Sequence, residues 1–366
     1  MPSQPEPTPL GSDVLLHVAD PTPTSGFQQF WSTWHDRVWA LPAALEPLGR
    51  PGSASYAAPV AGLTHTITST GGVRVGCRVD RPVGSEQPRG VVIVLHGYGM
   101  SAEEPLVAPS GLLDRGLATI TLRVRGYPGS QSETGDLLAR PGGYACQNIE
   151  SAEHWVVGDA VADVVCAFRA ARSAFGDALP VSIQGESFGG GLAVIAASAI
   201  AVRDGVFRLA IGLPTLGDWT WRLAHPQPGT ASGSLGDQVQ RWLAIHPQER
   251  EAALRTLRLF DAVTHARRVA CPVVCKLALH DDVVPPPAAA AVFNALGAAP
   301  GWKWRFVTRT GHGSGHGAEA VADLRRHALC TRLTNEFLDP IEYPQELMKR
   351  WEPLLGEGVN PPTPAA

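Results

Sequence analysis

Cysteine is scarce in this chain, with six among 366 residues. Disulfide scaffolds are far denser in cysteine, and no C-x-x-C pair is present to indicate a zinc or redox site. Cys271 and Cys275 fall on a predicted strand, where four residues span about 13 Å, too far for a disulfide. We therefore expect free, reduced thiols.

An excess of positive charge is also missing, because 30 lysines and arginines stand against 34 acidic residues. Binding to a nucleic-acid backbone is therefore not expected. The longest apolar stretch, residues 192–202 interrupted by Ser198, is too short for a bilayer, which needs about 20 residues. Residues 1–12 carry neither the basic nor the apolar region of a signal peptide. We expect a cytoplasmic protein without a membrane partner.

Motifs for cofactors are absent as well. The sequence has no H-E-x-x-H, no G-x-G-x-x-G after its first buried strand and no G-x-x-x-x-G-K-[ST]. These patterns provide a catalytic zinc site, a dinucleotide site and a P-loop nucleotide site, respectively. We expect the protein to use no cofactor and no metal.

The composition, 44% hydrophobic and 17% charged, supports a sizeable core and excludes a disordered chain. From residue 91 to residue 338, short apolar runs alternate with helical patterns. This alternation predicts a doubly wound, mostly parallel α/β sheet. The predicted strands are 91–95, 118–124, 180–184, 208–213, 272–279 and 303–308, and the predicted helices are 101–115, 159–175, 189–202, 247–260, 286–296 and 316–338.

The N-terminal part is predicted to extend this α/β body. Residues 1–23 are rich in proline and favour an extended or disordered lead. A helix with an aromatic stripe, from Gly26, is expected to pack on the body. Two alternating runs, 64–70 and 73–79, flank Gly71-Gly72 and predict a β-hairpin.

The predicted domain boundaries lie where the alternation of strands and helices stops. Residues 24–345 are predicted to form a single domain. Within it, residues 214–260 break the pattern and suggest an insertion or cap over the sheet, and residues 346–366 are expected to form a C-terminal tail.

The segment Gly185-Glu186-Ser187-Phe188-Gly189 has the form G-x-S-x-G. It lies between a predicted strand and a predicted helix, where a nucleophile elbow places a serine on a strained turn. The helix N-terminus then favours negative charge developing beside the serine. Ser187 is therefore the candidate nucleophile.

A nucleophilic serine needs a base and an acid, in the chain order Ser, acid, His. Asp281 and Asp282 follow one predicted strand, and His312 and His316 follow the next. We favour Asp281 and His312, which come first after their strands, and keep Asp282 and His316 as alternatives. A competing hypothesis treats these four residues and His280 as metal ligands, although the glycines between the two histidines argue against a helical zinc motif.

Two backbone N–H groups are needed to stabilise the oxyanion of an acyl transfer. Phe188, directly after the nucleophile, is one candidate donor. Tyr98, in the His96-Gly97-Tyr98 segment after the strand 91–95, is the other. Both are also candidate substrate-binding residues, whereas His96 is interpreted as a packing residue at the strand end.

The motifs together resemble the acetylxylan esterase / cephalosporin-C deacetylase family, carbohydrate esterase family seven of the α/β-hydrolases. The resemblance covers about residues 26–338. It rests on FW at 30–31, HGY at 96–98, RGxxGS at 125–130, GESFGGG at 185–191, LPTLGDW at 213–219, LRLFDAVTHARRVACPVV at 257–274, DDVVPP at 281–286 and GH at 311–312. Its acid loop places the catalytic Asp four residues before Pro-Pro, which favours Asp281.

Some positions depart from that family's pattern. Phe188 stands where glutamine is usual, Val284 where cysteine is usual, and Gly313 where glutamate is usual. The backbone N–H of Phe188 is unaffected by the change, while its side chain adds apolar bulk near the acyl site.

The resemblance implies a serine esterase that removes short acyl groups, mainly acetyl, from a sugar, an oligosaccharide or a similar alcohol through an acyl-enzyme. It also implies a homo-oligomer, since the family tends to form ring-like hexamers. The alternatives are a carboxylesterase or other hydrolase of the same fold with broader specificity, and a catalytically silent α/β-hydrolase that serves as a binding module.

Overall fold

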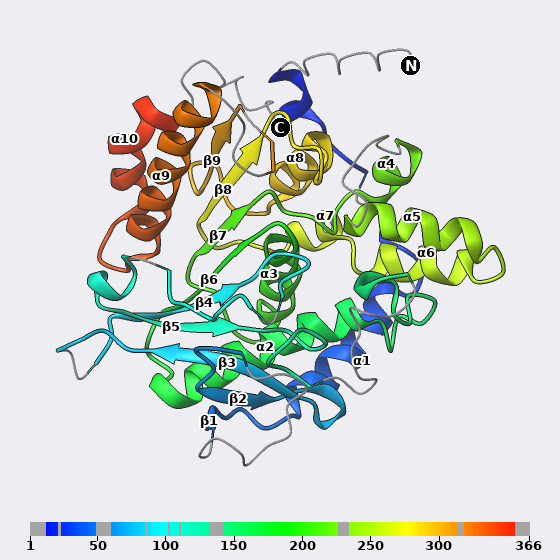
Figure 1. Ribbon diagram of the computed structural model, residues 1–366, viewed down its shortest axis with the longest axis horizontal. Coiled ribbons are helices and arrows are strands. Elements are labelled where there is room, and N and C mark those ends of the chain that lie inside the picture. Colours follow the sequence, from blue (N-terminus) through cyan, green and yellow to red (C-terminus); the bar gives the residue numbers. More distant parts are fainter. Residues whose placement is uncertain are drawn as a thin grey trace.

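A computed structural model gives the structure of the protein, and it describes residues 12–20, 23–48, 60–84, 87–101, 103–109, 111–131, 142–225, 234–309, 311–312 and 318–355. Within these residues nine strands form one sheet, in the order β1-β2-β3-β5-β4-β6-β7-β8-β9 (Figure 1). The strands from β5 to β9 run parallel, and β1 to β3 join their edge in antiparallel pairs. The strands are β1 (Glu46–Pro47), β2 (His65–Thr68), β3 (Arg74–Asp80), β4 (Gly90–Leu95), β5 (Leu117–Leu122), β6 (Val181–Glu186), β7 (Leu209–Gly212), β8 (Val273–Ala278) and β9 (Lys303–Thr308).

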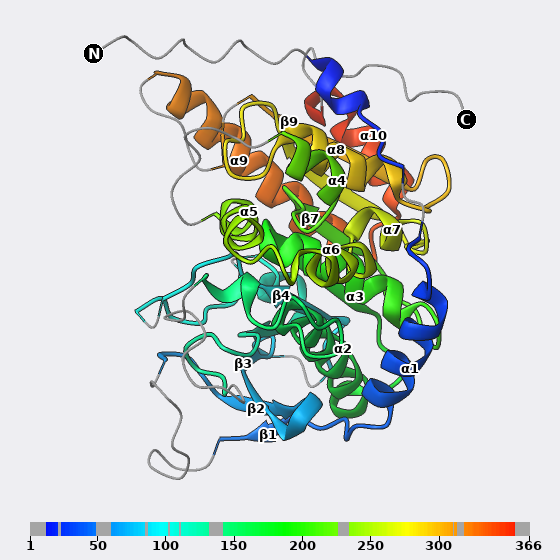
Figure 2. The same cartoon turned by 90° about the vertical axis from the view of Figure 1, so that its right-hand side faces the viewer.

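Helices cover both faces of this sheet (Figures 1 and 2). One face packs on α2, α3 and α8, with α1 and α7 packed against these helices, and the other face packs on α9 and α10. The parallel, doubly wound sheet predicted from the sequence is therefore confirmed. The helices are α1 (Phe27–Trp39), α2 (Val156–Phe175), α3 (Phe188–Ile200), α4 (Trp219–Ala224), α5 (Leu235–Ile245), α6 (Arg250–Leu259), α7 (Ala262–Ala266), α8 (Pro286–Ala295), α9 (Ala318–Leu338) and α10 (Pro344–Leu355).

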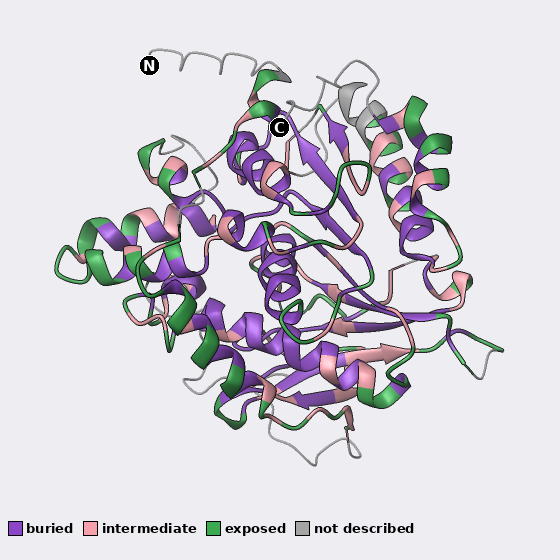
Figure 3. Cartoon of the chain, turned by 180° about the vertical axis from the view of Figure 1, so that it is seen from behind, coloured by how far each residue is buried: buried purple, intermediate pink, exposed green. Residues whose placement is uncertain are grey.

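The apolar strand runs are buried on both faces, as their continuous hydrophobicity indicates. Along β4, Val91 and Ile93 pack on the α2–α3 side, while Val92 packs on the α9–α10 side. Figure 3 shows the central strands and α3 almost entirely buried. Among the described helices, none combines the length and the apolar character required to span a membrane.

The predicted helix over residues 101–115 is wrong. The described residues between 103 and 109 form no helix, and only the short 3₁₀ helix η3 (Leu113–Arg115) precedes β5. Pro105 and Pro109 lack the N–H group that a helix interior needs, and Gly111 has φ 84°, outside the right-handed helical region.

Both chain ends contain more structure than a lead or a tail. The N-terminal lead includes the 3₁₀ helix η1 (Ser12–Leu16). Leu15 in this helix is fully buried, and its backbone carbonyl accepts a hydrogen bond from Asn294 Nδ2. Residues 346–355 belong to α10, where Leu347, Met348, Trp351 and Leu355 are buried. Their spacing places these side chains on one helical face, and that face packs in the core against α9 and β9.

The aromatic stripe of α1 packs on the body, as the sequence predicts. Trp31 Nε1 donates to the carbonyl of Leu259 at 2.9 Å, and the Trp31 ring packs edge-on against His265 at 4.4 Å. His265 is fully buried on α7, with Nε2 3.1 Å from the same carbonyl and Nδ1 3.1 Å from Ser198 Oγ. Its imidazole is therefore built into the core as a neutral group.

Burial lowers the pKa of His265 from 6.5 to about 3, so the native state resists its protonation. Between these two values the unfolded chain binds a proton that the native chain does not, and stability therefore rises with pH in this window. From pH 7 to pH 5 we expect His265 alone to remove about 2 kcal/mol from the free energy of unfolding. Urea denaturation of the wild type and of His265→Gln at several pH values measures this pH-dependent contribution of His265 to the free energy of unfolding. Equal pH slopes for the two proteins would contradict it.

Candidate active site

Ser187 forms the turn between β6 and α3, with φ 54° and ψ −116°. A non-glycine residue with positive φ is strained and persists only where its surroundings hold it. Here the Ser187 N–H donates to the carbonyl of Gly212 at 2.8 Å, and the Ser187 carbonyl accepts from the N–H groups of Gly191 and Thr215 at 3.1 and 3.2 Å. The half-buried serine is thus fixed at the carboxyl end of the sheet, in the elbow geometry predicted from the sequence.

The two glycines of the motif are required by close backbone approach. A Cβ on Gly185 would lie 2.5 Å from the carbonyl group of Gly189, and a Cβ on Gly189 would lie 2.7 Å from the carbonyl oxygen of His96. Any side chain at either position would push the elbow away from β4 and α3. The G-x-S-x-G pattern therefore reflects packing around the serine as well as its turn.

Asp281 follows β8, and its side chain is 1% exposed. Its Oδ1 accepts hydrogen bonds from the backbone N–H groups of Val283 and Val284 at 2.9 and 2.8 Å. Its Oδ2 lies 2.9 Å from His312 Nδ1. Asp282, in contrast, is exposed. The structure thus brings together His312 and Asp281.

His312 follows β9 and keeps 26% of its side chain exposed. A carboxylate only accepts hydrogen bonds, so Nδ1 carries the proton toward Asp281 and Nε2 remains the nitrogen that can accept one. Among the described residues no hydrogen bond joins Ser187 to His312; catalytic hydrogen bonds of this kind commonly tighten only when substrate binds. Because β6, β8 and β9 run parallel, Ser187, Asp281 and His312 all follow strand ends at the same edge of the sheet. His316 lies outside the described residues.

Phe188 is the first residue of α3, so its N–H has no partner within the helix and lies at the positive end of the helix dipole. Its side chain is fully buried. The ring packs among His96, Tyr98, Tyr127 and Tyr144, with centroid distances from 5.5 to 6.4 Å. The Phe188 side chain is therefore a packing group beneath the elbow.

Tyr98 follows β4, and its side chain is hydrogen-bonded to α5 and to the backbone of Ala145. Its hydroxyl donates to Gln238 Oε1 on α5 at 2.5 Å and accepts from the N–H of Ala145 at 2.9 Å. Burial raises the pKa of this hydroxyl, so it stays neutral. These contacts order the loop that carries the Tyr98 N–H.

His96 behaves as a packing residue. Its Nδ1 donates to the carbonyl of Gly97 at 2.7 Å, and its Nε2 accepts from the N–H of Val124 at 3.3 Å. Desolvation lowers the pKa of His96 to about 4, which keeps the ring neutral. His96 therefore supports the Tyr98 loop through a fixed tautomer.

The sequence interpretation missed two buried cations near these residues. Arg222, on α4, is 4% exposed, and its Nη1 donates to Thr215 Oγ1 at 2.6 Å. Burial lowers the pKa of Arg222 to about 10, although Asp281, Asp261 and Asp218 favour its charged form. Lys276, on β8, is 5% exposed and pairs with Glu186. A lysine inside an otherwise apolar strand is a signal that could have been used, because buried lysines need a partner.

The chain matches the acetyl xylan esterase family (AXE1) over residues 19–315. It belongs to this family. Its fold is similar to that of acetyl xylan esterase 1 from Thermoanaerobacterium sp. JW/SL YS485, with 19% sequence identity, a TM-score of 0.68, and 87% of this chain and 97% of the other covered. It is also similar to the acetyl xylan esterase from Paenibacillus sp. R4, with 21% identity, a TM-score of 0.66, and 87% and 98% covered.

This acetyl xylan esterase family member is thus an esterase of the α/β-hydrolase fold, a carboxylic ester hydrolase that acts on small-molecule esters. The resemblance found from the sequence motifs is confirmed. So is the fold predicted from the alternation of strands and helices.

Proposed function

We propose that the protein is a serine esterase that removes acetyl and similarly short acyl groups from a sugar, an oligosaccharide or a similar small alcohol. Ser187 is the nucleophile, His312 the general base and acid, and Asp281 the residue that orients His312. The observation that carries this proposal is the hydrogen bond between His312 Nδ1 and Asp281 at the same sheet edge as the strained Ser187.

In the first half of the reaction, Ser187 Oγ attacks the ester carbonyl carbon while its proton moves to His312 Nε2. The N–H groups of Phe188 and Tyr98 donate to the oxyanion that forms. The adduct then breaks its bond to the alcohol oxygen, which takes the proton from His312. The acyl group stays on Ser187.

In the second half, His312 takes a proton from water, and the hydroxide attacks the acyl carbon. The bond to Ser187 Oγ breaks, the serine regains its proton from His312, and a carboxylic acid leaves. Asp281 holds the Nδ1–H tautomer of His312 and stabilises the imidazolium in both halves.

The chain-length profile tests the substrate. We expect kcat/KM to fall steeply from p-nitrophenyl acetate to p-nitrophenyl butyrate and octanoate. In a second assay we expect the protein to deacetylate acetylated xylo-oligosaccharides. A flat or rising profile would instead support the broader carboxylesterase. Absence of turnover with every ester would support the binding module.

Two further elements complete the proposal, the first drawn from the arrangement around the site and the second from the family resemblance. Residues 24–345, with η1 and α10 packed onto them, act as one catalytic domain. The insertion at 214–260 supports the oxyanion loop through Gln238 and the acid's surroundings through Arg222. The protein works as a homo-oligomer, which light scattering after size exclusion measures.

A further inference from the structure

Glu186, the residue directly before the nucleophile, is joined to Lys276 by an ion pair. Lys276 Nζ lies 3.1 and 3.2 Å from the two carboxylate oxygens of Glu186. The side chain of Lys276 is 6% exposed, whereas that of Glu186 is 57% exposed. The pair therefore reaches from a buried strand to the surface beside the elbow.

Strand β7 lies between the two partners. In the sheet register Glu186 is opposite Gly212, and Gly212 is opposite Lys276, so the three residues form a row across the sheet. A Cβ on Gly212 would lie 2.8–3.0 Å from Cγ, Oε1 and Cδ of Glu186. The glycine thus leaves the space through which the Glu186 side chain crosses β7.

Gly212 contacts the elbow through its backbone as well, since its carbonyl accepts the Ser187 N–H. The same short row therefore contains the hydrogen bond that holds the strained serine and the ion pair that holds the residue before it.

The pair connects the two strands that carry the reacting groups. Strand β6 leads directly into Ser187, and β8 leads into Asp281, which binds His312. A charge-assisted link therefore spans from the strand of the nucleophile to the strand of the acid, in addition to the backbone pairing of β6, β7 and β8.

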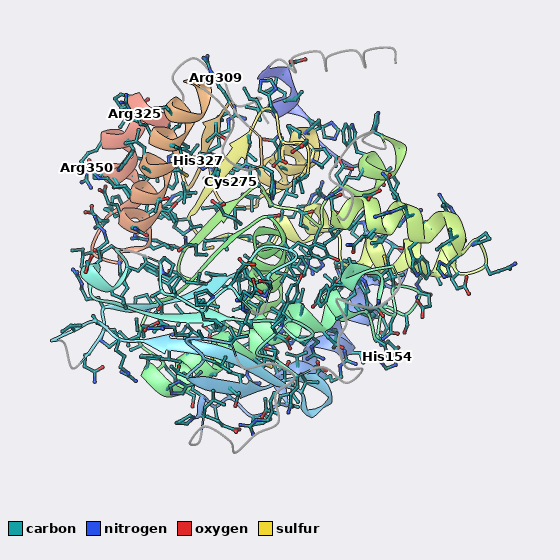
Figure 4. The ribbon with its side chains drawn as sticks, viewed as in Figure 1. His154, Cys275, Arg309, Arg325, His327 and Arg350 are labelled. Atoms are coloured by element: carbon teal, nitrogen blue, oxygen red, sulfur yellow. The ribbon has the colours of Figure 1, made fainter. Side chains whose placement is uncertain are left out.

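The surroundings make this link hard to replace. Figure 4 labels Cys275, which precedes Lys276 on β8 and packs on the α2–α3 side of the sheet, and His327 on α9, the helix that covers the opposite face. Burial raises the pKa of Cys275 and raises that of Cys330, on α9, to about 12, so these neighbouring thiols stay neutral. If Glu186 lost its charge, a buried ammonium would remain without its counterion.

We propose that Glu186 and Lys276 are positioning residues that hold Ser187 in register with the His312–Asp281 pair. This inference rests on the proposed function, because it assigns a task relative to that nucleophile. Neither side chain touches the substrate in this role, so their effect is on the reactivity of Ser187 and not on substrate affinity.

The test compares Glu186→Gln, Lys276→Met and the double variant. The double variant is the decisive one because it removes the link without leaving an unpaired buried charge. We expect all three to lower kcat for p-nitrophenyl acetate by about 10- to 100-fold, with little change in KM. The rate at which a fluorophosphonate labels Ser187 should fall in parallel.

A matched control is Asp204→Asn, which also removes a carboxylate from an ion pair, with Arg172 at 2.6 Å. Asp204 lies beyond the far end of α3, about 20 Å along the helix from the elbow. This variant should keep the wild-type kcat and labelling rate. A double variant that keeps the wild-type kcat and labelling rate would overturn the inference. Ser187→Ala, measured alongside, separates the outcomes, since activity in that variant would contradict the proposed function itself.

Discussion

Replacing Ser187 by alanine is expected to lower kcat for p-nitrophenyl acetate by about five to six orders of magnitude. The reason is that the hydroxyl is the atom that forms the acyl-enzyme, and nothing else at the elbow can replace it. The residual rate should be that at which water hydrolyses substrate bound next to the oxyanion donors. Steady-state turnover, with circular dichroism to show that the variant is folded, measures the effect.

Ser198→Ala is the matched control, because it removes a serine hydroxyl from α3, the helix that follows the elbow, at a position 3.1 Å from His265. We expect this variant to lose some stability and to retain kcat. Comparable activity of Ser187→Ala and wild type would show that the elbow is not the site of ester cleavage.

The second large effect on kcat is expected from substitution of Asp281, the acid that orients His312. Asp281→Asn should lower kcat by about four orders of magnitude, because the amide can donate to Nδ1 and thereby favour the wrong tautomer of His312. The substitution also weakens the loop, since Oδ1 accepts from the N–H groups of Val283 and Val284. Full pH–rate profiles of both proteins measure the loss.

Asp282→Asn provides the comparison at the neighbouring position. Asp282 is exposed, so its substitution should leave kcat nearly unchanged. If instead Asp282→Asn removed activity and Asp281→Asn retained it, the assignment of the acid would be reversed.

The sequence allowed the parallel sheet and the elbow to be predicted because both depend on local patterns. Continuous apolar runs mark strands buried on two faces, and β4, β6 and β8 lie where those runs occur. The G-x-S-x-G segment could be placed because a strand precedes it and a helix of small residues follows. The same order placed Asp281 and His312 at strand ends that share one edge.

Other features depend on contacts that no local pattern reveals. The helical pattern over residues 101–115 was misleading because Pro105 and Pro109 prevent continuous backbone hydrogen bonding. The segment from residue 346 follows the last predicted α/β unit and so resembles a tail, whereas its apolar spacing lets α10 pack into the core. Gln238 supports Tyr98 from a distance of 140 residues, and Glu186 meets Lys276 across 90 residues and an intervening strand.

The most direct test is to identify the covalent intermediate. Wild-type protein is mixed with p-nitrophenyl acetate, quenched in acid during the first turnover, digested and analysed by mass spectrometry. The account predicts a burst of p-nitrophenol and one acetyl group on the peptide that contains Ser187, with neither in Ser187→Ala. An acetyl group on another residue, or rapid turnover by Ser187→Ala, would contradict it.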